Sequence, residues 1–216
     1  MKCIVTAGPT FEELDGVRRL TNFSTGTLGS ELADYLAQHG HDVELLTGYY
    51  AICPPAAGPN RRQTFTTTAD LQSRLESLAS SQVGAVFHAA AVSDFTFGKI
   101  WERAGDGGLR EVKAAKIPTR DLALLAELLP TPKIIRHLRG WFPQAFLAGW
   151  KYELDGDRAQ TIAKGSRQIV ENQTDICIVN GLAYGEGFGL VDREGSHLHL
   201  RDKTALFAAL TSGLKG

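Results

Sequence analysis

The sequence lacks the features that mark several classes of protein. Among its 216 residues, no apolar run reaches the roughly 18 residues that a membrane-spanning helix needs. Lys and Arg number 23 and Asp and Glu number 24, so no basic field would attract nucleic acid or an anionic lipid surface. There is no internal repeat or low-complexity tail. With a hydrophobic fraction of 43%, the sequence predicts a soluble globular protein with a sizeable core and no nucleic-acid or membrane partner.

Cysteine is also scarce, at three residues. Cys3, Cys53 and Cys177 are widely spaced and form no CxxC pair, which argues against disulfides and metal sites. Cys3 and Cys177 lie in apolar runs and are expected to be buried as small hydrophobic residues, whereas Cys53 lies in a loop. The first residues, MKCIVTAGPT, lack the pattern of a signal peptide and indicate a strand. We therefore expect a cytoplasmic protein.

The order of the predicted elements favours an α/β fold. Apolar runs predict five strands, at 2–8, 42–48, 84–92, 145–153 and 174–181. Helical spacing predicts helices at 30–40, 69–79 and 157–171, and Thr131-Pro132 is expected to open another, with Thr131 as N-cap. The turn REGS between GFGLVD and HLHL predicts an antiparallel hairpin, followed by a last amphipathic helix. We expect one domain over residues 1–216, a Rossmann-like open, mostly parallel sheet with helices on both faces and a C-terminal hairpin.

Three connections carry unusual residues. ICPPAAGPNRR at 52–62 indicates a Pro/Gly loop. Residues 93–129 are too long and too poorly periodic for a plain connection, so we expect this segment to be functional or mobile, as a flap or dimer segment. Between the first strand and the first helix lies a long polar segment with two arginines, an asparagine and a late Gly26-x-x-Gly29. Chemically rich stretches follow the carboxyl ends of the strands, the edge at which such sheets bind ligands. A ligand site is therefore predicted at this edge.

The spacing of glycines bears on the kind of ligand. Gly26 and Gly29 directly precede a helix, where backbone N–H groups can approach phosphate oxygens. A standard nicotinamide site is disfavoured, since G-x-G-x-x-G is absent, no acid ends the second strand, and no Tyr has a Lys four residues later. No HExxH motif or acidic cluster predicts a metal site. His88, inside an apolar strand, is interpreted as a hydrogen-bonded core histidine.

A series of motifs resembles a known family. In order they are TAGPT, LDGVRRLTNFSTGTLG, AAAVSDF, a Lys-Ile pair, TPKII, GWKYELD and ENQTDICIVNG. Together they resemble the phosphopantothenoylcysteine synthetase (phosphopantothenate–cysteine ligase) family, in its stand-alone form without the decarboxylase domain. The resemblance implies a ligase of coenzyme A biosynthesis. It would activate the carboxylate of 4'-phosphopantothenate with CTP or ATP, and the amine of cysteine would then attack the acyl-nucleotidylate. It also implies Mg²⁺ bound with the nucleotide, and a homodimer with the active site near the subunit interface.

The resemblance also implies roles for single residues. Asn22 would hold the acyl-nucleotidylate, Arg18 would serve the second half-reaction, and Lys116 would form the intermediate, with Lys113 as its chief competitor. The implied nucleotide-binding residues are Gly8, Gly26, Gly29, Ala90, Ala91, Asp94, Pro132, Lys133, Ile134, Trp150 and Lys151.

Two departures from the family pattern leave a second hypothesis open. The run Lys-x-Lys-Lys of the fused enzymes is shortened here to Lys116-Ile117-Pro118-Thr119. Just before the fifth strand, where the family places a phosphate-binding lysine, this chain has Glu171 or Asn172. Arg167 and Lys164 are the candidate substitutes. The alternative is a catalytically weakened nucleotide-binding relative with a binding or regulatory role.

Overall fold

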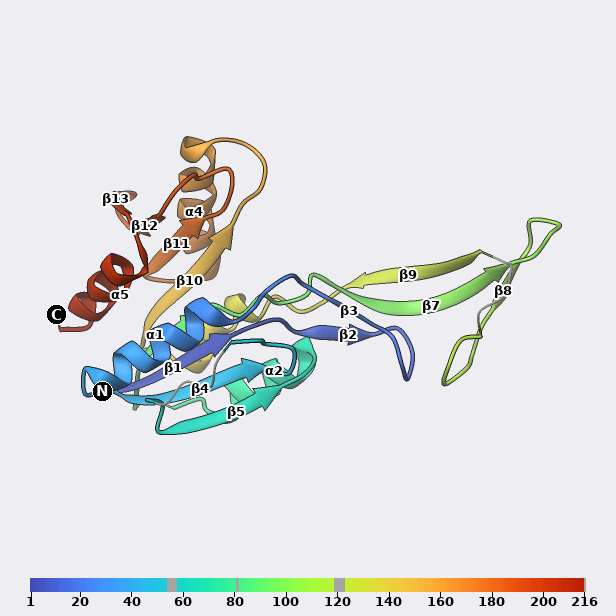
Figure 1. Ribbon diagram of the computed structural model, residues 1–216, viewed down its shortest axis with the longest axis horizontal. Coiled ribbons are helices and arrows are strands. Elements are labelled where there is room, and N and C mark those ends of the chain that lie inside the picture. Colours follow the sequence, from blue (N-terminus) through green and yellow to red (C-terminus); the bar gives the residue numbers. More distant parts are fainter. Residues whose placement is uncertain (54–57, 81, 119–122, 216) are drawn as a thin grey trace.

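The main sheet has eight strands in the order β13-β12-β11-β10-β6-β1-β4-β5 (Figure 1). The computed structural model describes residues 1–53, 58–80, 82–118 and 123–215. The strands are β1 Lys2–Ala7, β4 Asp42–Gly48, β5 Arg61–Phe65, β6 Val83–His88, β10 Phe146–Tyr152, β11 Ile176–Asn180, β12 Phe188–Asp192 and β13 His197–Leu200. From β5 to β11 all neighbours are parallel, whereas β12 and β13 form an antiparallel hairpin at the edge. The predicted α/β fold is confirmed.

Helices cover both faces of the sheet because its strands alternate between two cores. In β1, Cys3 and Val5 belong to one core and Ile4 to the other. The first core includes apolar residues of α1 Thr27–Gln38 and α5 Lys203–Ser212. The second includes those of α2 Thr68–Ser77, the 3-10 helix η1 Ile134–Arg136 and α3 Leu138–Trp141. The helix α4 Arg158–Asn172 packs with β11 and β12 in a third cluster, and the short η2 Gly213–Lys215 follows α5.

The helix ends differ in how they are capped. The Asp157 side chain accepts the Gln160 N–H at the start of α4, and Asp202 accepts the Ala205 N–H at the start of α5. By contrast, α1 begins after Gly26, which has φ 75° and makes no side-chain cap bond. The Thr27 N–H donates to the Thr25 hydroxyl at 3.3 Å. The next two N–H groups of α1, those of Leu28 and Gly29, keep their capacity to bind a ligand.

Some predicted boundaries were wrong. The edge strand β5 overlaps the predicted loop 52–62, of which 54–57 lie outside the described residues; four of its five residues are polar, so no apolar run marks it. β6 ends at His88 and not at Val92. Thr131 does not cap a helix, because its hydroxyl donates to the Ser93 carbonyl and the next helical turn is the short η1.

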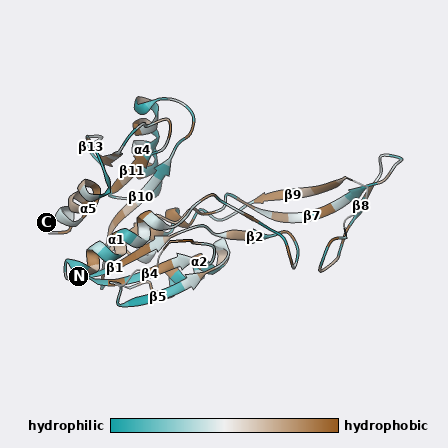
Figure 2. Ribbon diagram, in the orientation of Figure 1, coloured by the Kyte–Doolittle hydropathy of each residue, from teal (hydrophilic) through white to brown (hydrophobic). Residues whose placement is uncertain are grey.

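The two long connections contain strands of their own. β2 Phe11–Glu13 and β3 Arg19–Thr21 form a small hairpin after β1. Most of the predicted flap is an antiparallel sheet of β7 Phe95–Arg103, β8 Leu109–Glu111 and β9 Leu124–Pro130; residues 119–122 of it lie outside the described chain. This sheet, here called the arm, projects away from the main sheet (Figure 1). Figure 2 shows β9 as strongly hydrophobic, although Leu124, Leu128 and Leu129 on it are exposed.

The cysteines are free, as expected. Cys3 and Cys177 are fully buried, and this burial raises the pKa of their thiols to about 11 and about 12. The Cys53 thiol lies 3.1 Å from the Ser30 hydroxyl. No helix within the described ranges is long and apolar enough to cross a membrane.

Candidate functional site

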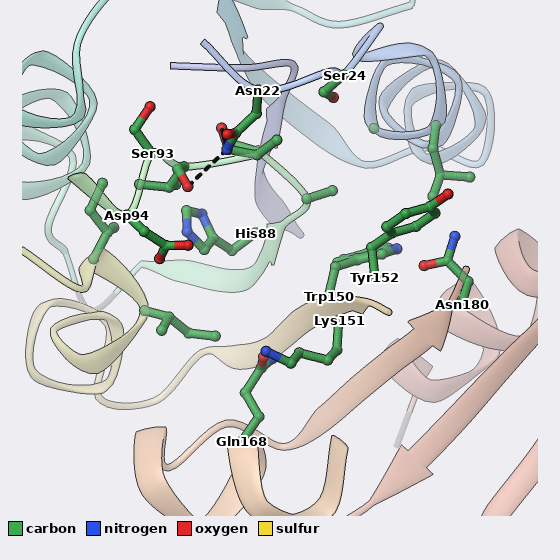
Figure 3. A pocket seen from close by; sticks show the side chains of 18 of the residues that line it. Asn22, Ser24, His88, Ser93, Asp94, Trp150, Lys151, Tyr152, Gln168 and Asn180 are labelled. Atoms are coloured by element: carbon green, nitrogen blue, oxygen red, sulfur yellow. Dashed lines mark hydrogen bonds between the residues drawn. The ribbon is translucent and has the colours of Figure 1, made fainter. Parts of the chain in front are cut away.

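A cavity of about 880 Å³ lies at the carboxyl edge of the sheet, where the sequence predicts a ligand site. Its lining comes from residues 22–29, 88–94 and 133–136, the end of β10, one face of α4, and Asn180 at the end of β11. Figure 3 shows Asn22, His88 and Asp94 on one side of the cavity and Trp150, Lys151 and Asn180 on the other. The volume suits a small-molecule ligand of nucleotide size.

Glycines bring the start of α1 into the lining. A Cβ on Gly29 would lie 2.7 Å from the Ala7 Cβ, and one on Gly26 would lie 3.1 Å from the Gly8 Cα. Only glycine at these positions allows α1 to lie this close to β1. Gly8 supports the loop from behind and does not line the cavity. The uncapped end of α1 thus faces the cavity, with the partial positive charge of a helix N-terminus.

Asn22 ties the hairpin loop to the segment after β6. Its Nδ2 donates to the carbonyl oxygens of Ala91 and Val92, at 3.3 and 3.1 Å. Both N–H donors of the amide are thereby used, and its Oδ1 remains as an acceptor. The position therefore offers a fixed hydrogen-bond acceptor at the cavity wall.

The floor of the cavity begins at His88. Its Nδ1 lies 2.9 Å from the Thr6 hydroxyl, so the predicted hydrogen-bonded histidine is confirmed, and burial lowers its pKa to about 4. The floor continues with Ala89, Ala90 and Ala91, whose small side chains leave room above them. That His88 also lines the cavity was not predicted, because the apolar run around it indicated only a buried strand.

The charged side chains around the cavity are mostly basic. Five basic residues face three acidic ones: Lys133, Arg136, Lys151, Lys164 and Arg167 against Asp94, Glu153 and Glu171. Lys133 pairs with Asp94. The lining therefore carries a net positive charge, which favours an anionic ligand.

Glu153 holds two of these lysines. Lys151 Nζ lies 3.4 Å from one carboxylate oxygen, and Lys164 pairs with the other. Partial burial alone would raise the pKa of Glu153, but the hydrogen bond from Lys164 and the charge of Lys151 outweigh it and lower the pKa below its ordinary value. The carboxylate thus stays charged and keeps both ammonium groups at the cavity wall.

Most of the residues predicted from the sequence come together here. Ten line the cavity: Asn22, Gly26, Gly29, Ala90, Ala91, Asp94, Lys133, Ile134, Trp150 and Lys151. On α4, the candidate substitutes Lys164 and Arg167 and the departing position, Glu171 or Asn172, also line the cavity, whereas Gln168 on the same helical face was not predicted. Four predicted residues do not line it: Gly8, Arg18, Lys116 and Pro132.

Arg18 and Lys116 lie in a separate cluster, here called the arm-base cluster (residues 15–18 and 115–117). The Arg18 guanidinium lies 3.1 Å from the Asp15 carboxylate and also donates to the Ile117 carbonyl. The Ile117 N–H donates to Asp15 at 3.1 Å, and the Gly16 N–H to the Ala115 carbonyl at 2.8 Å. Lys116 is exposed on this docked loop. The structure therefore joins Arg18 to the Lys116 loop, outside the cavity of the same chain.

No group of three or more His, Cys, Asp or Glu side chains that could hold a metal ion occurs among the described residues. The cavity acids are dispersed, and Asp94 and Glu153 are paired with lysines.

Comparison with known proteins shows the family and the fold. Residues 1–209 match the model of the DNA/pantothenate metabolism flavoprotein C-terminal domain family. The coenzyme A biosynthesis bifunctional protein CoaBC of Thermococcus kodakarensis is 29% identical over 89% of this chain and 43% of its own length. CoaBC of Vibrio cholerae is 31% identical over 97% of this chain and 51% of its own length. The chain thus spans about half the length of these curated relatives.

Solved structures share the fold. The DNA/pantothenate metabolism flavoprotein of Streptococcus pneumoniae is 25% identical, with a TM-score of 0.83 over 100% of this chain and 98% of the other. A Cab2 mutant in complex with phosphopantothenate-cysteine is 20% identical, with a TM-score of 0.69 over 100% of this chain and 89% of the other. The motif order, the fold and the match over residues 1–209 agree: the chain belongs to the DNA/pantothenate metabolism flavoprotein C-terminal domain family.

Proposed function

We propose that this chain is a phosphopantothenate–cysteine ligase that uses CTP or ATP in coenzyme A biosynthesis, in the cytoplasm. The observation that carries the proposal is the cavity itself. An uncapped helix N-terminus and an excess of basic side chains surround a space of about 880 Å³, over a floor of small residues. That combination suits a large ligand with several phosphate groups. The CoaBC relatives and the Cab2 complex with phosphopantothenate-cysteine support the same assignment.

The reaction has two steps. The carboxylate of 4'-phosphopantothenate attacks the α-phosphorus of the nucleotide, the bond to the β-phosphate breaks, and pyrophosphate leaves with the bonding electrons. The amine of cysteine then attacks the acyl carbon, loses a proton, and expels the nucleoside monophosphate. Both steps move negative charge among phosphate oxygens. Fixed N–H groups and cations are what stabilise such charge.

Different residues of the cavity bind different parts of the ligands. The end of α1 after Gly26 receives a phosphate group, and Trp150 offers an indole surface to the nucleotide base. Asn22 Oδ1, the acceptor left by its two donated bonds, takes an N–H of the ligand or of the cysteine amine.

Lys151 and Lys164 replace the phosphate-binding lysine that is absent at Glu171 and Asn172. Both ammonium groups reach the cavity, and Glu153 between them holds both in place. Because the single carboxylate of Glu153 faces two lysines, Lys151 and Lys164, this wall keeps a net charge of +1 from the three residues. The wall can therefore bind the β- and γ-phosphates although Glu171 lies nearby.

Mg²⁺ fits this cavity as an ion that arrives with the nucleotide. Because no cluster of metal ligands exists among the described residues, phosphate oxygens and water would provide most of its ligands, and Asp94 or Glu171 at most one. When bound, the ion would neutralise phosphate charge.

The exposed surface of the arm is an argument for a homodimer. Exposed apolar side chains gather on the arm and the β2–β3 hairpin: Val17, Leu20, Phe95, Leu109, Leu124, Leu128 and Leu129. Such surface is typical of an interface. Arg18 and Lys116 do not line the cavity of their own chain, so a second copy would bring them to it.

The test is pyrophosphate release by the purified chain with CTP or ATP. Release that requires both nucleotide and 4'-phosphopantothenate, with product formed only when cysteine is added, supports the ligase. The second candidate, a nucleotide-binding relative without turnover, is motivated by Glu171 in the lining. Nucleotide binding by calorimetry without pyrophosphate release under any combination would favour it and contradict the ligase.

A further inference from the structure

The floor of the cavity offers few hydrogen-bond donors. The Ala89 N–H donates to the Thr6 carbonyl at 3.2 Å, the Ala90 N–H to the Thr6 hydroxyl at 3.1 Å, and the Ala91 N–H to the Gly8 carbonyl at 3.0 Å. These backbone groups hold the segment against β1 and are not free to bind a ligand. An acyl phosphate above this floor therefore cannot take a hydrogen bond from Ala89, Ala90 or Ala91, and a side chain of the floor is the donor to look for.

His88 is that side chain. It is 7% exposed and it lines the cavity, where Figure 3 shows it among the surrounding side chains. Nδ1 is bonded to the Thr6 hydroxyl, whereas Nε2 makes no hydrogen bond within the part of the chain that the structure describes. His88 Nε2 is not among the fully buried side-chain atoms that lack a partner, which fits a nitrogen that is open to the cavity and can be reached by a ligand.

The bonds of Thr6 decide which nitrogen carries the proton. The Thr6 hydroxyl oxygen accepts the Ala90 N–H, and its own proton needs an acceptor because Thr6 is fully buried. His88 Nδ1 is the acceptor within reach, at 2.9 Å. Nδ1 is then unprotonated, and the proton of the neutral ring lies on Nε2. Burial favours this neutral form by lowering the pKa to about 4.

We propose that His88 is a ligand-binding residue whose neutral Nε2–H donates a hydrogen bond to an oxygen of the acyl phosphate that forms in the cavity. The inference rests on the proposed ligase function. The position fits, because β6 lies between β1, which leads to the helix of Gly26 and Gly29, and β10, which carries Trp150 and Lys151. His88 at the end of β6 thus lies between the two walls, where the acyl and nucleotide halves of the intermediate meet. A neutral donor binds the oxygen without giving up a proton to it.

Two amide variants separate this role from a structural one. His88→Asn keeps an acceptor near the Nδ1 position for Thr6 and removes the donor at Nε2. His88→Gln places an amide near the Nε2 position and loses the acceptor for Thr6. We expect His88→Asn to lower kcat/KM for pyrophosphate release about ten- to a hundredfold, the loss of one hydrogen bond to a charged group. His88→Gln should stay within about tenfold of the wild type yet unfold at a lower temperature than His88→Asn.

A control exists elsewhere in the chain. Tyr184 and His199 form a similar hydroxyl–imidazole pair at 2.9 Å, and neither lines the cavity. His199→Asn should leave kcat/KM unchanged. Wild-type activity in His88→Asn, or activities that follow only the unfolding temperatures, would overturn the proposal.

A readout independent of turnover separates this inference from the proposed function. In ¹⁵N-histidine spectra, assigned with the His88→Asn variant, His88 should be the neutral Nε2–H tautomer at pH 7, and Nε2 should shift when CTP, ATP or 4'-phosphopantothenate is added. A shift without pyrophosphate release would refute the ligase and retain His88 as a ligand donor. An Nδ1–H tautomer, or no shift with any of these compounds, would overturn the inference about His88.

Discussion

The cavity and the arm-base cluster differ in how their polar residues are organised. Around the cavity, polar groups are held with unused capacity facing the open space: the uncapped end of α1, Asn22 Oδ1 and the two lysines on Glu153. In the arm-base cluster, Asp15 accepts the N–H groups of Val17, Arg18 and Ile117, and Arg18 is bonded to Asp15 and Ile117. Here the polar groups satisfy one another, and Lys116 is left exposed.

If the proposed function holds, this difference would separate ligand binding from catalysis within one chain. The cavity has what is needed to bind a phosphorylated ligand, whereas two of the three residues with implied catalytic roles, Arg18 and Lys116, belong to the arm-base cluster. The residues on either side of Lys116 are hydrogen-bonded to the 15–18 turn, so the cluster holds the Lys116 loop against this turn. In the proposed homodimer, a loop held in this way would present Lys116 to the cavity of the other copy.

The largest effect is expected at Lys116. Lys116→Gln removes a cation that would act on the α-phosphate mainly in the transition state. Pyrophosphate release should fall on the order of a hundred- to a thousandfold, while nucleotide affinity stays within roughly tenfold. Steady-state kinetics and calorimetry measure the two quantities.

Lys113→Gln is the matched control for this prediction. Lys113 lies on the same segment and pairs only loosely with Glu111, at 3.5 Å. The Lys113→Gln variant should lose much less activity than the Lys116→Gln variant. The opposite order of the two variants would mean that the residue assigned to the phosphate is wrong.

A smaller effect is expected at the phosphate wall of the cavity. Lys164→Gln removes one of the two charges on Glu153 and should raise KM for the nucleotide about five- to tenfold, with kcat within about twofold, because a partly exposed charge contact contributes about 1 kcal/mol. Glu171→Lys restores the charge that the family pattern has there and should lower KM by a similar factor. If neither variant changes KM, the triphosphate does not contact this wall.

The effect expected on activity at pH 7 is smallest for the last prediction, which concerns stability as a function of pH. The pKa of His88 is about 4 in the folded protein, below its ordinary 6.5, so the unfolded chain binds a proton in this range that the folded chain does not. The free energy of unfolding should therefore fall as the pH drops from about 6.5 to 4, by about 3 kcal/mol from this group. Urea unfolding of the wild type and His88→Asn at pH 7.5, 6 and 5 measures the difference. Parallel pH profiles would show that His88 titrates normally.

The sequence predicted the strands that are buried on both faces and, from its turn, the C-terminal hairpin, but it missed the other exposed strands. β1, β4, β6, β10 and β11 carry long apolar runs, and each was predicted. β5 has the sequence RRQTF, whose polar side chains face solvent at the sheet edge, so hydrophobicity could not reveal it. The arm was predicted only as a long flap because its leucines face solvent and show no alternation of buried and exposed positions.

Local sequence motifs predicted the lining residues of the cavity where a single segment forms one wall. TNFSTGTLG and AAAVSDF each supply neighbouring residues of the lining, and both were recognised. The role of His88 depends on Thr6 and Ala90, on a neighbouring strand and a following turn, and could not be read from an apolar run. The location of Lys116 away from the cavity likewise depends on hydrogen bonds between residues about one hundred positions apart, such as Asp15 and Ile117.

Mixed dimers test most directly the claim that the cavity of one chain receives Lys116 from another. Asn22→Asp and Lys116→Gln chains, co-expressed with different affinity tags and purified through both tags, pair one chain of each kind. If the site is shared between copies, each mixed dimer keeps one intact site and should show about half of the wild-type activity, although each variant alone is nearly inactive. If every site is complete within one chain, or the protein is monomeric, no such active species would be recovered, and this result would contradict the account.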